Sequence, residues 1–340
     1  MKHLLYFGLF SVMACGKKPG SYQIKEIESA AEASAEADLA QKADAQWNAR
    51  ADKAQLEAAL ASYETLWVQN PNDRLVGERL VRGWYFYGDA YESDIEAKKS
   101  AWDKAISFGE QCLSINEEYK AIYSKEQKRE DAAQALKKDD VPCTYWTASA
   151  LGKWAKASGL ATTLKYIGGA KAFIAKVEEL EPTYFHGAVH RYWGAYYAGL
   201  PSFAGQDLDR SKAEFEKAIS ISQDYLGTRI LLADYWATKN QDQVAVFDEQ
   251  VQYVMASDVN ALDPELIPEN LAEIEKAKDL WALRSEKFLD APEPAPLQNQ
   301  PPVAAPPEEA PAEEAPAEEA PVEEDTEENV EQSDEAVAPE

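Results

Sequence analysis

The chain has 340 residues, a formal net charge of −27, three cysteines and three histidines. Sixteen acidic and no basic residues lie in 291–340, so the rest of the chain is only moderately acidic. This charge balance argues against nucleic acid as a partner.

The N-terminus has the pattern of a secretion signal. A basic start precedes an apolar run, Leu4 to Ala14, that ends at Cys15. The run is shorter than the about 20 residues that a membrane-spanning helix needs, so residues 1–14 are predicted to be a signal peptide. A small residue directly before the cysteine is typical of a lipoprotein cleavage site. We therefore expect a lipid on Cys15, and ordinary secretion with an incidental cysteine is the alternative.

The residue after Cys15 indicates where the protein is sorted. This residue is Gly16 and not an Asp, which resembles the outer-membrane sorting pattern of bacterial lipoproteins. Each buried methylene of an acyl chain contributes about 0.8 kcal/mol, so several chains on one cysteine would anchor stably. We expect a cell-envelope protein held by its lipid at the outer membrane and facing the periplasm, with surface display as the alternative. Residues 15–45 would form the lipidated N-terminus and a stalk or helix.

Residues 46–290 are predicted to be helical almost throughout, because no stretch alternates apolar and polar residues between hairpin turns. Pro71 and Pro182 fall where helical repeats end. The expected fold is all-α, an irregular tetratricopeptide-like superhelix of helix pairs. The expected later helices are Leu75–Tyr91, Ala97–Leu113, Tyr119–Lys138, Cys143–Lys156, Leu164–Leu180, Tyr225–Lys239, Val244–Met255 and Leu271–Leu289.

Two cysteines, Cys112 and Cys143, remain after the predicted processing, in a compartment that permits disulfides. Sequence alone does not give the distance between them, so a disulfide and two separately buried thiols both stay open. Neither has CxxC spacing, which argues against metal or redox chemistry.

The segment 182–237 resembles one tetratricopeptide repeat with an inserted loop. Trp193, Gly194 and Tyr197 fit the first helix of such a repeat, and Phe215 and Ala218 fit the second. The distance from Gly194 to Ala218 is five residues longer than the repeat allows. The added loop, 199–207, is either a wall of an opening or a structural plug between repeats. Asp207 and Asp209, just before the second helix, are expected to cap it and to favour its dipole.

These features resemble the TRAP transporter T-component (TatT) family, periplasmic lipoproteins built from irregular tetratricopeptide-like helix pairs. Gln206 stands where the family has a second glycine before the Asp. The resemblance covers roughly residues 45–290. The matching motifs are Tyr184-Phe185 to Tyr197 with Gly199-Leu200-Pro201 and Gly205-Gln206-Asp207, then Lys212-Ala213-x-Phe215-x-x-Ala218, and Val246-Phe247 to Val254-Met255 with Pro268-x-Asn270 and Lys276-Ala277.

The resemblance implies helices that enclose a hydrophobic hole, protomers that associate as homotrimers, and contact with a periplasmic solute-binding protein. Most aromatic residues at helical spacing pack between helices, and a minority are expected to face the hole. The candidate hole-lining residues are Trp84, Phe86, Trp193, Tyr197, Leu200, Pro201 and Phe203.

Residues that could catalyse a reaction or hold a metal or cofactor are few. His186 and His190 stand four apart but lack the intervening Glu of a zinc-protease helix and an evident third ligand. No GxSxG, phosphate-binding loop or Cys-His arrangement is present. We therefore expect no enzyme, no catalytic residue, no metal and no cofactor. A glycan-cleaving activity would need a groove Glu with a raised pKa, and no residue is marked for that role.

The C-terminal segment, 291–340, contains Pro-Ala-Glu-Glu-Ala repeats and no aromatic residue. Such a composition buries too little apolar surface to offset chain entropy, so a disordered acidic tail is predicted. It would be an extended spacer or a docking strip for a basic surface.

The predicted function is binding in the service of a TRAP-type solute uptake system. The protein would engage a solute-binding protein and pass a hydrophobic or organic-acid ligand through its hole. The alternative is a tetratricopeptide-like scaffold of an envelope complex without a small ligand.

Overall fold

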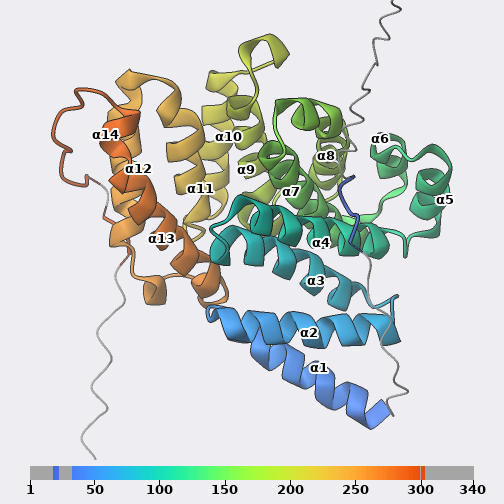
Figure 1. Cartoon of the computed structure of the whole chain (residues 1–340). Helices are drawn as coiled ribbons and strands as arrows, with labels where there is room; N and C mark the ends of the chain where they lie inside the picture. The colour runs from blue at the N-terminus through green and yellow to red at the C-terminus, as the bar shows by residue number, and fades with distance from the viewer. Residues whose placement is uncertain (1–17, 23–32, 299, 303–340) are drawn as a thin grey trace, which may run out of the picture. The chain divides into compact units, whose positions relative to one another are not determined.

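The computed structural model describes residues 18–22, 33–298 and 300–302 (Figure 1). The predicted all-α class is confirmed: the described part of the chain consists of helices and their connections, with no strand. The predicted signal peptide, Cys15 and most of the predicted acidic tail lie outside the described residues. Within the described part, no helix is both long and apolar enough to cross a membrane.

The helices follow one another in short succession along the chain. The α-helices are α1 Ala33–Asn48, α2 Lys53–Gln69, α3 Arg74–Phe86, α4 Ile95–Leu113, α5 Glu117–Glu126, α6 Arg129–Ala132, α7 Val141–Ala157, α8 Leu160–Leu180, α9 Tyr184–Gly199, α10 Leu208–Ile221, α11 Gly227–Leu231, α12 Val244–Ala256, α13 Ile267–Ala282 and α14 Arg284–Lys287. Two short π-helical segments are η1 Tyr87–Tyr91 and η5 Leu232–Trp236. Short 3₁₀ segments are η2 Ala133–Ala135, η3 Lys138–Asp140, η4 Ser202–Ala204, η6 Ala237–Lys239, η7 Gln241–Gln243, η8 Val259–Ala261 and η9 Pro264–Leu266.

Aspartate and asparagine side chains define where five of these helices begin. A side-chain oxygen at the N-cap accepts backbone N–H groups that have no partner within the helix, which is typical of Asp and Asn. The same contact before α10 agrees with the capping role that the loop sequence suggests. The capping residues are Asp52, Asp73, Asp94, Asn116 and Asp207.

Helices that are neighbours in sequence pack in pairs, α1 with α2, α3 with α4, α7 with α8, and α9 with α10. Figure 1 shows these pairs succeeding one another from α1 to α10, with α11 to α14 beyond them. One apolar cluster extends from α1 to α9, and a second joins α10 to α14. Helices α4 and α7 pack tightly at Gly109, where an added Cβ would overlap Oγ1 of Thr147. Only glycine fits at that crossing.

Two of the expected helices are interrupted. The expected helix Tyr119–Lys138 is wrong beyond α5, because Gln127 takes a left-handed conformation with φ of 53° and ends the helix there. The expected helix Leu271–Leu289 begins earlier, with Pro268 in its first turn, and breaks after Ala282. Proline suits a first turn because the N–H that it lacks would have no helical partner there.

A disulfide joins α4 to α7. Cys112 and Cys143 are both buried, and their Cα atoms are 6.2 Å apart. The residues between the two cysteines form α5, α6 and the connecting 3₁₀ segments. The bond therefore fixes both ends of this segment to the paired helices α4 and α7.

The start of the predicted tail contacts the helices. Ala291 and Leu297 pack against the second apolar cluster, and Nη2 of Arg284 donates a hydrogen bond of 2.7 Å to the carbonyl oxygen of Pro292. The helical unit therefore holds at least residues 291–297 against its surface.

Candidate ligand cavity

A cavity of about 500 Å³ lies among α3, α7, α8, α9, α11 and α13. This volume falls within the usual range for small-molecule sites in proteins. Tyrosine and tryptophan supply much of its wall, and charged side chains are interspersed among them. The aromatic residues that line it are Tyr85, Tyr145, Trp146, Tyr192, Tyr196, Tyr225 and Tyr235.

Both π-helical segments contribute to this cavity. η1 places Asp89 in the wall, and η5 places Asp234 and Tyr235 there. A π-helical turn holds one residue more than an α-helical turn, and such turns often occur at functional sites. Their convergence on one cavity supports a functional role for it.

Aromatic rings pack closely in the cavity wall. Trp146 meets Tyr145 edge to face, with ring centroids 4.9 Å apart, and meets Tyr85 at an interplanar angle of 49°, with centroids 5.3 Å apart. Both α7 aromatics are buried, and aromatic pairs in this geometry are favourable beyond the area they bury. The wall is therefore a preformed apolar surface.

A chain of alternating charges crosses one side of the cavity. Asp89 accepts hydrogen bonds of 2.5 Å from Nζ of both Lys153 and Lys276, and Lys276 also lies 2.8 Å from Oε1 of Glu273. Burial alone would raise the pKa of Asp89, but the two ammonium groups outweigh it and hold that pKa well below its usual range. The lysines stay protonated for the same reason, so this cluster is ionised and internally balanced.

Two more lysines lie in the cavity wall. Nζ of Lys287 is 3.2 Å from Oδ1 of Asp234. The ammonium group of Lys156, an exposed residue, lies 3.8 Å from the ring centroid of Tyr235. The first lysine is paired with a carboxylate, whereas the second contacts an aromatic face.

Arg191 is the most deeply buried cation of the wall that has no carboxylate partner in the described part of the chain. It is 4% exposed. Its Nη1 donates to the carbonyl oxygen of His186 at 3.0 Å and to Oγ1 of Thr228 at 3.4 Å, and its Nη2 donates to the carbonyl oxygen of Phe185 at 3.2 Å. The guanidinium carbon lies 4.0 Å from the ring centroid of Tyr225. All these partners are neutral.

The carbonyl groups that Arg191 binds belong to an unusual backbone turn. Phe185, His186 and Gly187 have φ values of 40°, 57° and 74°, within the left-handed region. This conformation costs roughly 1–2 kcal/mol for each residue that has a side chain, and such strain often accompanies functional sites. The hydrogen bonds from Arg191 stabilise the turn directly beside the cavity.

The predicted hole-lining residues are mostly placed elsewhere, and of the seven only Leu200 lines the cavity. Nε1 of Trp84 donates to Glu64, and Nε1 of Trp193 donates to Glu178. Phe86 is buried in the first apolar cluster. These three side chains hold helices together.

The remaining three candidates lie on or near the loop between α9 and α10. Arg210 lies over the ring of Tyr197 at 4.3 Å, Pro201 is half-buried, and Phe203 is 79% exposed. This loop projects from the helices at the top of Figure 1. Of the loop 199–207, only its first two residues line the cavity.

Neighbours of the predicted residues, on the same helices, line this cavity. Successive residues of an α-helix are about 100° apart around its axis, so a shift by one residue changes the face. Tyr85 lines the cavity beside Trp84, and Tyr192 and Tyr196 line it beside Trp193 and Tyr197. Sequence reasoning missed the charged residues of the wall, because most of their pairs join distant positions. Asp89 is 64 residues from Lys153 and 187 residues from Lys276.

The two histidines have separate partners. Nδ1 of His186 lies 3.1 Å from Oγ of Ser222, and Nδ1 of His190 lies 2.7 Å from Oε2 of Glu214. Burial and the charge of Arg191 lower the pKa of His186. Within the described residues, no group of three His, Cys, Asp or Glu side chains is placed to hold a metal ion.

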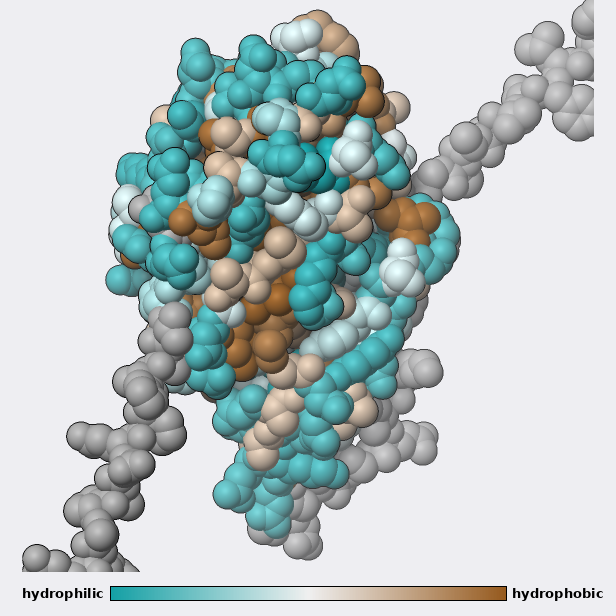
Figure 2. Space-filling view, turned by 90° about the vertical axis from the view of Figure 1, so that its left-hand side faces the viewer, coloured by the Kyte–Doolittle hydropathy of each residue, from teal (hydrophilic) through white to brown (hydrophobic). Residues whose placement is uncertain are grey.

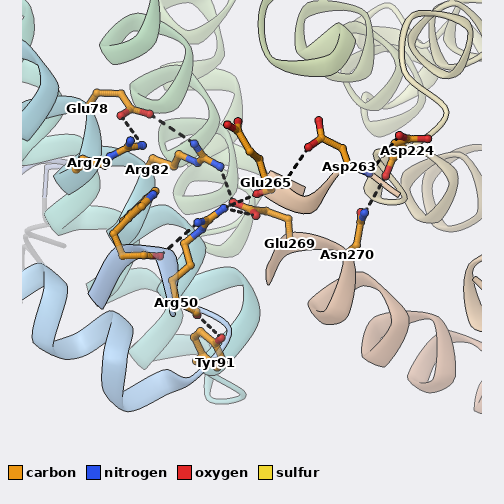
Figure 3. Close-up of polar contacts among 11 residues, drawn as sticks. Arg50, Glu78, Arg79, Arg82, Tyr91, Asp224, Asp263, Glu265, Glu269 and Asn270 are labelled. Carbon is orange, nitrogen blue, oxygen red and sulfur yellow. Dashed lines mark hydrogen bonds and ion pairs between the residues drawn. The ribbon is translucent and has the colours of Figure 1, made fainter. Parts of the chain in front are cut away.

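A buried ionic network ties α13 to α3, as Figure 3 shows. Glu269 lies 2.8 Å from Nη2 of Arg50 and 2.7 Å from Nη2 of Arg82. Arg82 also approaches Glu78 within its own helix. Because α3 and α13 both contribute wall residues, this network holds two walls of the cavity in place.

The exposed apolar side chains are the remaining surface feature of the described residues. The face of the molecule in Figure 2 is largely polar, with apolar side chains gathered near its centre. Exposed large apolar residues of the described part include Leu75, Phe203 and Leu289. They are scattered over separate helices and loops, and single exposed apolar residues are normal in soluble domains.

Comparison with known proteins gives one family. A family model described as TRAP transporter T-component matches residues 50–288, which is more than half of the chain and includes every cavity-lining residue. No curated protein matches the sequence significantly. The match agrees with the resemblance found in the sequence, and the chain therefore belongs to the TRAP transporter T-component family.

Proposed function

We propose that this protein is a lipid-anchored envelope component that engages a periplasmic solute-binding protein of a TRAP-type transporter and holds a hydrophobic or organic-acid ligand in its cavity. Membership of the family implies association with a TRAP transporter, and a transporter component belongs in the cell envelope. The energy for transport would come from other components.

The observation that carries the ligand part of this proposal is the composition of the cavity. An aromatic wall surrounds a volume of about 500 Å³, and a buried arginine with only neutral partners lies in that wall. Aromatic and apolar walls that carry placed polar groups are typical of small-molecule sites. The other charged side chains of this wall are paired with one another or exposed. The two π-helical segments that converge there add support, because they place side chains in the wall that a regular helix would not.

The anchor is tested separately from the ligand. We expect the mature chain to begin at Cys15 and to carry acyl chains, as the signal sequence predicts. Intact mass measurement of protein purified from membranes would detect the added mass, and Cys15→Ser should abolish it and release the protein from the membrane. A mature N-terminus elsewhere would contradict the anchor.

Native mass spectrometry tests the partner and the assembly. The protein purified from cells is measured alone and then mixed with solute-binding proteins from the same organism. A stable complex with one of them, or a co-purifying organic acid or lipid-like mass, supports the transport role. The same spectrum reports whether the chain forms the homotrimer that the family resemblance implies.

The opposite result would favour the alternative. A ligand-free chain that binds none of the solute-binding proteins would contradict the proposed role. It would instead support a helical scaffold that holds an envelope complex together.

A further inference from the structure

The arginines of the described part differ in how their charge is balanced. The full sequence has nine, and six of them form ion pairs with carboxylates. The paired residues are Arg50, Arg74, Arg79, Arg82, Arg129 and Arg284. Among the other three, Arg210 is exposed and Arg229 half-buried, whereas Arg191 is 4% exposed. Arg191 is therefore the exception: a deeply buried charge without an opposite charge beside it.

The wall of the cavity has more basic than acidic side chains. It contains five basic and four acidic side chains, although the whole chain has a net charge of −27. Three of the lysines are paired with carboxylates inside the wall. The unpaired acidic residue of the wall, Asp279, is exposed, as is Lys156. The interior of the cavity is thus left with the charge of Arg191.

We infer that the cavity binds a monocarboxylate with an apolar body, and that Arg191 binds its carboxylate group. This inference rests on the proposed function, since it names the class of ligand that the cavity takes. A buried charge is costly unless an opposite charge accompanies it, and an arginine binds a carboxylate through two parallel hydrogen bonds. The carboxylate would provide the missing charge, while Tyr85, Trp146 and Tyr192 contact the apolar body.

The position of Arg191 suits this role. Three neutral acceptors and the ring of Tyr225 fix its guanidinium group before any ligand arrives, so little side-chain entropy is lost on binding. A single guanidinium group balances a single negative charge. A carboxylate therefore fits better than a phosphate, which carries up to two charges at neutral pH.

The test compares matched acids and amides by isothermal titration calorimetry on the full chain as purified. The probes are 3-phenylpropionate against 3-phenylpropanamide, and octanoate against octanamide. We expect each acid to bind more tightly than its amide by a factor of roughly ten to a hundred, because a charge-assisted hydrogen bond is about twice as strong as a neutral one. Arg191→Gln should remove this preference, because it lowers the affinity for each acid by about that factor and the affinity for its amide by much less.

The control variant is Arg210→Gln. Arg210 also has no carboxylate partner within the described residues, but it is exposed and does not line the cavity. The same change of charge there should leave both affinities unchanged. An equal loss of acid preference in the two variants would show that net charge alone is responsible, and would overturn the assignment.

Arg191→Gln also removes hydrogen bonds from the left-handed turn and could unfold the chain. A second measurement therefore uses the wild-type protein. The wild-type protein is crystallised with 3-(4-bromophenyl)propionate, whose bromine gives an anomalous signal. We expect the carboxylate within hydrogen-bond distance of Arg191 and the bromine against the aromatic wall. A carboxylate that points to the cavity mouth would overturn the inference.

The outcomes separate this inference from the proposed function. Equal binding of acid and amide would keep the cavity as a ligand site and reject Arg191 as its anion-binding residue. Failure of both acids to bind, together with a stable complex with a solute-binding protein, would reject the carboxylate ligand and keep the partner role.

Discussion

Arg82 in α3 donates a hydrogen bond of 2.7 Å to Glu269 in α13, although 187 residues separate them along the chain. Arg50, just beyond α1, reaches the same carboxylate at 2.8 Å. One buried Glu thus connects three parts of the fold, and the cavity walls on α3 and α13 depend on it.

Glu269→Gln should therefore destabilise the protein strongly. The change leaves the guanidinium groups of Arg50 and Arg82 without their shared negative charge, and breaking a buried ion pair on one side costs about 3–5 kcal/mol. Urea unfolding followed by circular dichroism measures the loss. Glu265→Gln, an exposed position one turn earlier, is the matched control and should change stability by less than about 0.5 kcal/mol.

The pH dependence of that loss follows from the pKa of Glu269. Burial opposes ionisation, but Arg82 and Arg50 outweigh it and lower the pKa of Glu269 below its ordinary value. The folded pKa is thus below the unfolded one, about 4.3, so the stabilisation is present above that pH and is lost as the pH falls through the folded pKa. The stability difference between wild type and Glu269→Gln should be constant from pH 8 to 6 and shrink below about pH 4. A difference that changes between pH 8 and 6 would implicate another group.

Asp89→Asn should also destabilise the fold. Asp89 lies between Lys153 and Lys276, and without its charge the two half-buried ammonium groups would repel each other. We expect a loss of about 3 kcal/mol in the free energy of unfolding. Asp279→Asn is the control, because that exposed carboxylate also lines the cavity but makes no ion pair with another described residue. Equal effects of the two changes would contradict the role of Asp89.

The bond between Cys112 and Cys143 predicts sensitivity to reductant. It closes a loop with a sequence separation of 31, for which chain entropy predicts a contribution of about 3–4 kcal/mol. Dithiothreitol should lower the unfolding midpoint of the wild type and leave a Cys112→Ala, Cys143→Ala double variant unaffected. Alkylation of both cysteines in denatured, unreduced protein would show that the bond is absent.

Gly194→Ala should loosen the pairing of α9 with α10. An added Cβ would lie 2.7 Å from the Phe215 ring, too close without movement of one helix. Overpacking of this kind costs about 1–3 kcal/mol. Gly152→Ala is the control: its added Cβ would meet the Tyr192 ring at 3.8 Å, an ordinary contact. We expect that variant to be neutral or slightly stabilised, since alanine favours helix more than glycine, and thermal unfolding distinguishes the two.

The sequence by itself determined the features that arise from local chemistry. The absence of alternating strand patterns predicted an all-α chain, and Asp207 appears as the cap that its place before α10 suggested. The motifs around Gly194 and Phe215 led to the family, and these two residues do meet where α9 packs on α10. Such features depend on spacings of a few residues or on one helix pair, and sequence displays these directly.

Only the tertiary structure decided which side chains face the cavity. Rotation by about 100° per residue separates Tyr85 from Trp84 and Tyr192 from Trp193, and periodicity cannot resolve one residue in a run of aromatics. Partners such as Asp89 and Lys276 are brought together by the path of the whole chain, because ion pairing depends on distance in space and not on distance along the sequence. For the same reason, only the tertiary structure shows that no carboxylate of the described residues forms an ion pair with Arg191.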